Sequence, residues 1–226
     1  MKNYTRLPAG RQGFTLIEML VSVAIFTIVM VIALGALLSL SEADRKAQTI
    51  NAAVNNLSFA IDSMSRLMRT GINYHCGSDT STRALTESQN CINAFSSPPG
   101  PQPQMAFQVV DDSLSGCTKG SACTVVYCLS VEGSTNSCNS AVSCAAGSSC
   151  SILRAICAGA SCTSYTPITS PEVSISSLSF YVTGSALGDT IEPKATILVS
   201  GTVPVTATKS TAFNLQTSVT ARLYGQ

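Results

Sequence analysis

The stretch GFTLIEMLVS, residues 13–22, begins the long apolar run of the chain and contains a carboxylate within it. The run covers residues 14–40, and Glu18 is the only charged residue in it. A helix of this length rises about 40 Å, which exceeds the roughly 30 Å thickness of a bilayer's hydrocarbon core. The run therefore predicts a transmembrane helix over residues 14–40, and the charge at Glu18 requires an explanation.

The basic flank of this run lies on its N-terminal side, where Lys2, Arg6 and Arg11 precede Gly13. The positive-inside rule therefore predicts a cytoplasmic N-terminus, with everything after the run outside. A secretory signal peptide is the main alternative, but its apolar stretch has only about 7–15 residues and ends at a small-residue cleavage site. An ordinary signal anchor has the observed hydrophobicity, but it explains neither the glycine before the run nor the carboxylate in it.

Residues 41–70 continue the helical pattern with one apolar face. Apolar residues recur there at steps of four and three, which is typical of an amphipathic helix, and Gly71 supplies a C-terminal stop. We therefore expect one helix over residues 14–70 whose second half packs on a folded head. A coiled-coil partner is the alternative, although the stripe spans only about four heptads. The stripe consists of Ala43, Ala47, Ile50, Val54, Leu57, Ile61, Met64 and Met68.

The sequence Gly13-Phe14-Thr15-Leu16-Ile17-Glu18, between a basic leader and an apolar helix, resembles the prepilin signature of type IV pilins and type II secretion pseudopilins. The resemblance implies that a prepilin peptidase removes residues 1–13 and methylates the new N-terminus at Phe14. It also implies that other pilins or pseudopilins bind through the N-terminal helix. One departure is Gly35, which stands where many major pilins have a proline.

The same resemblance suggests a reason for the carboxylate of Glu18. A charge near the bilayer centre costs a few kcal/mol, but close to the interface, as in the precursor, the cost is small. Once subunits pack helix against helix, the carboxylate needs a cation, and the α-amino group of a neighbouring Phe14 is a suitable one. We therefore expect Gly13 and Phe14 to be the cleavage and methylation site, and Glu18 to be the assembly residue.

Residues 71–226 are expected to form an exported, β-rich head. Short runs rich in Val, Ile, Thr and Tyr, separated by Gly, Pro, Ser or Asn, predict strands and a largely antiparallel sheet covered by the amphipathic helix. The predicted fold class is α+β and pilin-like. Within the head, residues 72–104 are predicted to be irregular. The predicted strands are residues 105–110, 124–129, 152–157, 173–182, 195–203 and 211–223.

All ten cysteines lie in the predicted head, which favours disulfides in an oxidising compartment. Residues 131–151 form a cysteine-rich insertion with few large side chains, and cross-links would hold such a loop where packing cannot. A zinc site and unpaired thiols are the alternatives, but for zinc the chain has no C-x2-C pair and only one histidine. Cys76 with Cys91 is the most plausible local pair. The full set is Cys76, Cys91, Cys117, Cys123, Cys128, Cys138, Cys144, Cys150, Cys157 and Cys162.

The sequence favours no enzymatic activity, cofactor or metal. His75 is the only histidine available to a Ser-His-Asp or Cys-His site, and its neighbour Cys76 is expected to be bridged. Asp111 and Asp112 are predicted to lie in a solvent-exposed turn, and not to form an acid/base pair or a calcium site. No G-x4-G-K-[ST] phosphate loop occurs. The chain has a formal net charge of +1, whereas a dedicated nucleic-acid-binding protein has a large excess of basic residues.

The resemblance therefore predicts a structural subunit, anchored in the bacterial inner membrane by one span and later part of a periplasmic or surface filament. Membrane lipid, the prepilin peptidase and other pilins are the expected partners. Residues 213–219, FNLQTSV, also look like the closing strand of J-type minor pseudopilins and similar minor pilins. The alternative is an adhesin-like binding head, displayed at a filament tip, in which residues 131–151 contact a ligand.

Overall fold

The computed structural model of the chain describes residues 13–77, 88–91, 102–109, 117, 122–131, 138, 143–145, 147–157, 162, 165–186, 188, 190–206 and 209–222. By its internal contacts the chain divides into two compact units, residues 1–47 and residues 48–226. Three predicted features lie outside the described residues: the leader before Gly13, the pair Asp111 and Asp112, and most of the insertion at 131–151.

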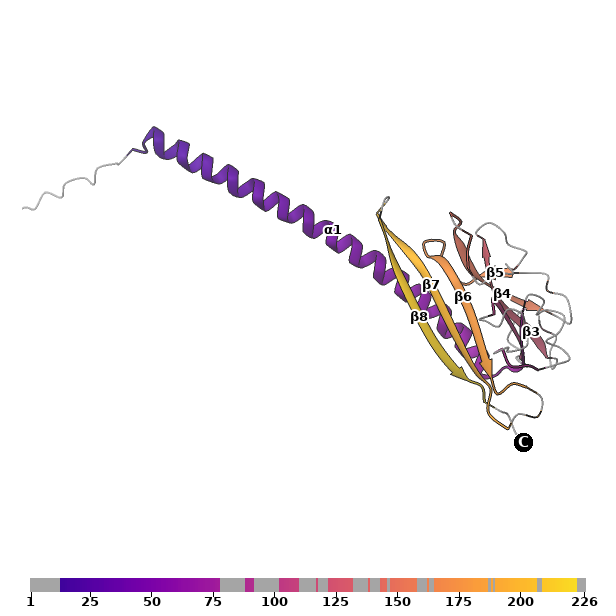
Figure 1. The fold of residues 1–226 in the computed structure, drawn as a ribbon. Helices are drawn as coiled ribbons and strands as arrows, with labels where there is room; N and C mark the ends of the chain where they lie inside the picture. Colours follow the sequence, from indigo (N-terminus) through magenta and orange to yellow (C-terminus); the bar gives the residue numbers. More distant parts are fainter. Residues whose placement is uncertain are drawn as a thin grey trace, which may run out of the picture. The chain divides into compact units, whose positions relative to one another are not determined.

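The long helix expected from the sequence is confirmed as α1, which spans Leu16–Arg69 and has 54 residues (Figure 1). Two backbone hydrogen bonds that each span three residues end the helix. Thr70 N–H donates to the carbonyl of Leu67, and Gly71 N–H donates to the carbonyl of Met68. Arg66 and Arg69 lie in its last turn, where cations interact favourably with the negative end of the helix dipole.

Five antiparallel strands form the first sheet, in the order β1-β2-β3-β4-β5. The sequence predicted the three central strands but missed the first and the last. The first strand has Asn and His within it, and the last has only three residues and ends in proline, so neither shows a clear hydrophobic alternation. The strands are β1 (Ile72–Cys76), β2 (Gln104–Val109), β3 (Cys123–Val131), β4 (Cys150–Cys157) and β5 (Tyr165–Pro167).

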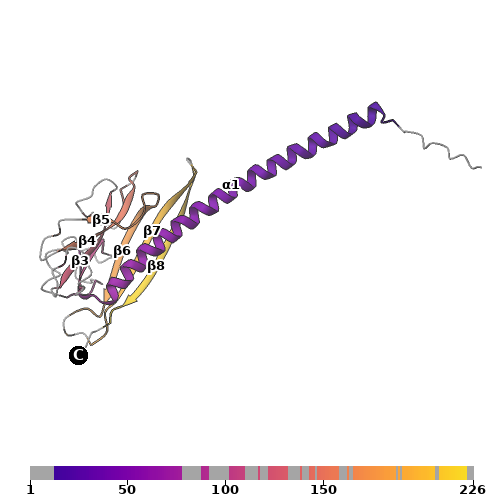
Figure 2. The same ribbon diagram turned by 180° about the vertical axis from the view of Figure 1, so that it is seen from behind.

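The remaining strands form a second, three-stranded antiparallel sheet in the order β6-β7-β8. They are β6 (Ser174–Thr183), β7 (Lys194–Thr206) and β8 (Lys209–Thr220). In both views of the ribbon the part of α1 that belongs to the second unit, residues 48–69, lies alongside β7 and β8 (Figures 1 and 2). The predicted α+β fold with an antiparallel head is confirmed, and the head divides into two sheets where one was expected.

The buried face of α1 differs in phase from the predicted stripe. Leu57, Met64 and Met68 are buried as expected, but Val54 is 51% exposed, and its place in the core is taken by Ala53. Ala60 is likewise fully buried. Small side chains at the contact let a helix approach a sheet closely, and hydrophobic periodicity alone cannot distinguish such an alanine from a neighbouring valine.

The structure contains several disulfides, as expected from the composition, and the described residues include no free cysteine. It pairs Cys76 with Cys91, which holds β1 against the segment at residues 88–91. Every bridge joins cysteines that follow one another in the sequence, with separations of 5 to 15 residues. The other four pairs are Cys117–Cys123, Cys128–Cys138, Cys144–Cys150 and Cys157–Cys162.

Candidate functional site

The segment that carries the sequence motif lies at the start of α1. Gly13, Phe14 and Thr15 precede the helix in a non-helical conformation, and the helix begins at Leu16. Phe14 is 72% exposed, and a Cβ placed on Gly13 would meet no atom within 4 Å. The peptide bond between Gly13 and Phe14 therefore lies in an open, non-helical segment directly before α1.

Thr15 is the N-cap of α1. Its carbonyl accepts hydrogen bonds from the N–H of Glu18 at 3.1 Å and of Met19 at 3.3 Å. Its hydroxyl accepts a longer one from the N–H of Glu18 at 3.4 Å. A threonine N-cap followed three residues later by glutamate is the capping-box pattern, which satisfies donors that the first helical turn leaves without intrahelical partners.

Glu18 lies in the first turn of α1, where a carboxylate interacts favourably with the positive end of the helix dipole. Its side chain is exposed. An ion pair joins Arg66 to Asp62, at 2.9 Å, but among the described residues none is recorded for the carboxylate of Glu18. The site thus presents an N-capped helix start with an unpaired acid in its first turn.

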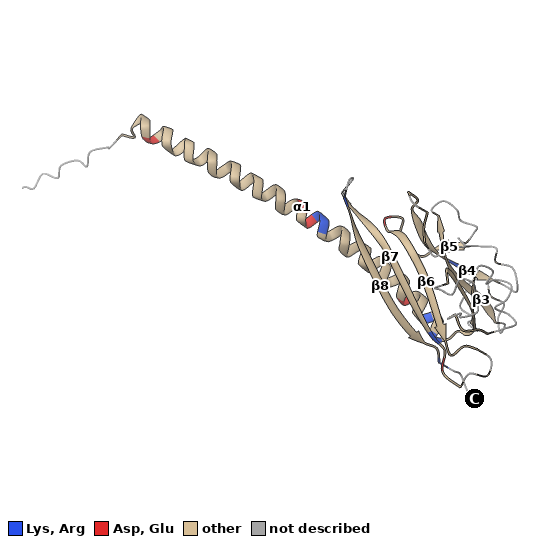
Figure 3. Ribbon diagram, in the orientation of Figure 1, with Lys and Arg blue, Asp and Glu red and all other residues tan. Residues whose placement is uncertain are grey.

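The surface that follows this acid is apolar on all sides. Every residue of 16–40 is exposed, and by length and composition α1 is long and apolar enough to cross a membrane. The next charged residues on the helix are Glu42, Asp44, Arg45 and Lys46, and Figure 3 shows charged positions midway along α1. A helix that is apolar all round is buried in protein or in lipid.

Two of the catalytic candidates of the sequence, His75 and Cys76, lie in the described part of the chain. His75 is buried, and its Nε2 lies 3.2 Å from the side-chain nitrogen of Gln89. Its neighbour Cys76 is bonded to Cys91 and is not available as a nucleophile. Among the described residues no group of three or more His, Cys, Asp or Glu side chains is placed to hold a metal ion.

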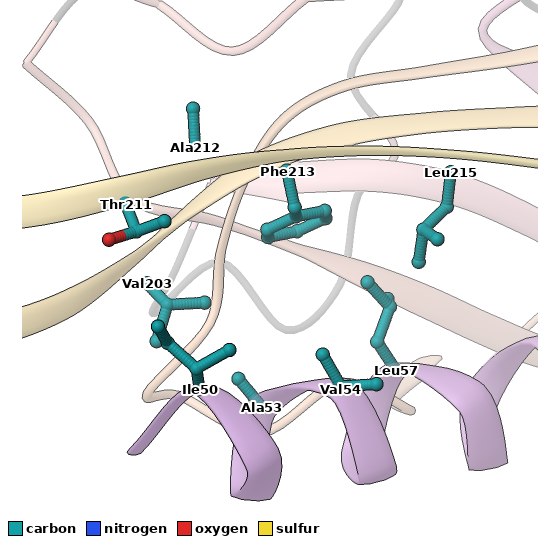
Figure 4. Close-up of a pocket in the computed structure, with 9 residues that line it drawn as sticks. All are labelled: Ile50, Ala53, Val54, Leu57, Val203, Thr211, Ala212, Phe213 and Leu215. Carbon is teal, nitrogen blue, oxygen red and sulfur yellow. The ribbon is translucent and has the colours of Figure 1, made fainter. Parts of the chain in front are cut away.

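A second surface feature, which the sequence did not indicate, is an apolar groove between α1 and β8. Its volume is about 130 Å³, and Phe213 and Leu215 of β8 point into it toward the helix (Figure 4). The groove lies in the region of the predicted closing strand at residues 213–219, which forms the central and C-terminal part of β8. We refer to it as the α1–β8 groove; it is lined by Ile50, Ala53, Val54, Leu57, Val203, Thr211, Ala212, Phe213 and Leu215.

Comparison with known proteins identifies the N-terminal segment. A family model described as the prokaryotic N-terminal methylation motif matches residues 8–34. No curated protein and no solved structure matches the chain. The matched residues include the open Gly13–Phe14 bond, the Thr15 cap and Glu18. The chain therefore carries a type IV pilin-type methylation signature at the start of its long apolar helix.

Proposed function

We propose that this protein is a structural subunit, a minor pilin or minor pseudopilin, of a type IV pilus or type II secretion filament. The observation that carries the proposal is the methylation motif at residues 8–34, set directly at the start of an exposed apolar helix. In this role the chain is made as a precursor anchored in the inner membrane, with residues 1–13 in the cytoplasm and the disulfide-bonded head outside. It acts by assembly, not by catalysis.

Cleavage between Gly13 and Phe14 would create the group that Glu18 lacks. The new α-amino group on Phe14 is a cation, and methylation keeps its charge. When subunits pack their apolar helices together, this amine of one subunit can pair with Glu18 of its neighbour. An ion pair between two apolar helices is favoured over either charge alone, because a lone charge in a low-dielectric contact is costly.

The test is coexpression with a prepilin peptidase, followed by intact-mass measurement. The mature chain should lack thirteen residues and begin with a methylated phenylalanine. Gly13→Leu should block processing, since the resemblance places a small residue before the cut. Gly35→Leu is the matched control, because a Cβ at Gly35 also meets no atom within 4 Å, and it should be processed normally. A wild-type chain that stays uncut would overturn the proposal.

A binding head displayed on the filament is a second candidate function. It is supported by the disulfides beside the connection between β3 and β4. Cys128–Cys138 and Cys144–Cys150 tie the two ends of the insertion to these strands. Because Val131 pairs with Cys150 in the β3–β4 ladder, the insertion should be removed only between these two residues. Replacing residues 132–149 by a short Gly-Ser turn, with Cys128→Ser and Cys150→Ser, should leave assembly intact and abolish adherence of filament-bearing cells. Unchanged adherence would contradict this candidate.

A further inference from the structure

Phe59 is an exposed aromatic residue on the part of α1 that belongs to the second unit. Its side chain is 75% exposed. The described residues from 48 onward include other exposed large apolar side chains, such as Ile191 and Val54, but Phe59 is the most exposed of them and the only aromatic one. The solvent face of an amphipathic helix normally carries polar side chains. Phe59 therefore presents an aromatic ring to solvent on a face where a polar residue is expected.

The α1–β8 groove lies on the other side of the same helix. Its helix wall consists of Ile50, Ala53, Val54 and Leu57. Phe59 follows Ile50 by about two and a half turns, at about 3.6 residues per turn. The two side chains therefore leave the helix in opposite directions, and the ring of Phe59 cannot reach the groove of its own chain.

The groove has the size and the chemistry to bind one aromatic ring. Its volume is about 130 Å³, and an apolar cavity of about 150 Å³ in another protein binds benzene. Its lining residues are uncharged, and Thr211 is the only one of them with a polar side chain. Phe213 and Leu215 point into the groove from β8 (Figure 4). A ring inserted there would contact apolar side chains of both the helix and the strand.

The groove is open to solvent along its rim. Val54 on the helix wall is 51% exposed and Leu215 on the strand wall is 36% exposed, whereas Leu57 and Val203 are buried. An aromatic ring bound between the two walls would remove the exposed apolar surface of Val54 and Leu215 from water. Burial of apolar surface is the dominant favourable contribution to most protein association.

A second copy of the chain supplies an occupant with matching chemistry, because every copy presents the ring of Phe59 as well as the groove. A symmetric dimer would need both features on one self-complementary surface. Since they lie on opposite sides of α1, the contact is instead directional. The ring of one copy enters the groove of the next, and the groove of the first copy stays available for a further copy. Heterologous contacts of this kind repeat along a row of subunits.

We propose that Phe59 of one copy inserts into the α1–β8 groove of a second copy and joins the two heads. Each further copy adds in the same direction. This inference goes beyond the proposed filament role and does not depend on it, because both features lie within the unit of residues 48–226. Its failure would leave the processing test untouched.

The experiment replaces Phe59 of the full-length chain by the photoreactive residue p-azidophenylalanine, which keeps the aromatic ring. The protein is reconstituted in liposomes of phosphatidylethanolamine and phosphatidylglycerol, because a detergent chain would compete for the apolar groove. Illumination should cross-link two copies. Mass spectrometry should place the second attachment point in residues 50–57 or 211–215. A mixture of copies with heavy and light nitrogen identifies the product as intermolecular.

Two variants test whether the groove is the acceptor. Val54→Phe fills the groove with a side chain of its own helix. It should lower the yield of the cross-link about tenfold or more, as expected when a phenyl ring loses its buried site. Asn51→Phe adds the same side chain at a nearby exposed position of α1 that does not line the groove. It should leave the yield unchanged.

A mixture of two different copies tests the direction of the contact. One copy carries the photoreactive residue at position 59 and Val54→Phe, so that its own groove is filled. The other carries Phe59→Ala and an intact groove. The first copy should form no product with itself but should cross-link to the second. An acceptor copy with both Phe59→Ala and Val54→Phe should form no product.

Three outcomes would overturn the proposal. These are the absence of a cross-link between copies, an attachment point on lipid or on residues outside the groove, and equal yields for Val54→Phe and Asn51→Phe. Equal chemical unfolding of these two variants establishes that the comparison is made between folded proteins. The map of attachment points uses no groove variant, so it decides the question even if Val54→Phe weakens the fold.

Discussion

Glu18 can contribute to two different structures, its own helix and the filament. Within the chain it occupies the third helical position after the Thr15 cap, where an acid stabilises a helix start by about 0.3–1 kcal/mol. In the proposed filament it would pair with the amine of a neighbouring Phe14. A substitution at Glu18 therefore needs a control that removes only the first contribution.

We predict that Glu18→Val leaves membrane insertion and cleavage intact but prevents or slows assembly. Insertion improves because a carboxylate leaves an apolar helix. Assembly fails because the neighbouring amine enters an apolar contact without its counter-ion, at a cost of about 3–5 kcal/mol, or roughly a hundredfold or more in association. Co-purification of mature protein with partner pilins measures this effect. Glu18→Gln should be intermediate if it keeps a hydrogen bond to the amine.

The control for this prediction is Thr15→Val, which removes the capping hydroxyl with little change in shape. It should cost about 1 kcal/mol of helix-start stability and speed amide exchange in the first turn of α1. It should affect assembly far less than Glu18→Val. Wild-type assembly of Glu18→Val would show that the carboxylate is not the docking group.

At this scale the sequence carried most of the information about the N-terminal segment. Gly13, Phe14 and Glu18 were proposed as site residues because a charge and a glycine are conspicuous at an apolar run, and these roles stay predictions. The Thr15 cap was missed, although threonine three residues before glutamate was visible in the same motif. The direction in which the backbone groups of β8 point carries no comparable signal in the sequence, because it depends on which strands pair.

At the scale of elements, the junction between α1 and β1 is built around Gly71. A Cβ at this position would lie 2.6 Å from Cδ2 of Phe107, whose ring is fully buried and stacks on Tyr74 with centroids 5.4 Å apart. The hydroxyl of Tyr74 donates to the carbonyl of Met68 near the helix end, and burial raises the pKa of Tyr74, which keeps it protonated as a donor.

We predict that Gly71→Ala destabilises the head by about 1–3 kcal/mol through overpacking. The ring of Phe107 would have to move, and the hydrogen bond from Tyr74 would be disturbed. Chemical denaturation of the full chain in detergent measures the change. Phe107→Leu should partly rescue Gly71→Ala, because it frees space at the clash. Gly35→Ala is the control and should not destabilise the head, since alanine favours a helix by about 1 kcal/mol over glycine.

Elements were predictable where their pattern was local. α1 and six of the strands follow from hydrophobic periodicity, with end errors of a few residues. The division into two sheets did not follow, because it depends on which strands pair: β5 joins β4 in the first sheet, whereas β6 joins β7 in the second. The prediction that Val54 is buried was wrong for a similar reason. Packing against the sheet buries Ala53 and leaves Val54 exposed, and this packing cannot be derived from the helical pattern alone.

At the scale of the whole molecule, the disulfides are predicted to stabilise the head more than the helix. Reduction should loosen the head, and the loss for a structural bridge is about 2–5 kcal/mol, although values near zero occur. Cys76–Cys91 closes the longest loop, 15 residues, and in the chain-entropy model its loss should cost most, about 3 kcal/mol. Non-reducing peptide mapping of protein purified from the cell envelope should recover the five pairs. Ten free thiols would contradict this prediction.

The neighbour-to-neighbour bridging has a consequence for how the head matures. The chain is proposed to leave the cytoplasm with its N-terminal end anchored, so its cysteines would emerge one after another from Cys76 to Cys162. In every bridge the second cysteine pairs with the one that emerged just before it. An oxidase that joins each new thiol to the preceding free one would therefore produce the native pattern directly. We expect the head to mature without a disulfide isomerase, because the order of export already selects the correct partners.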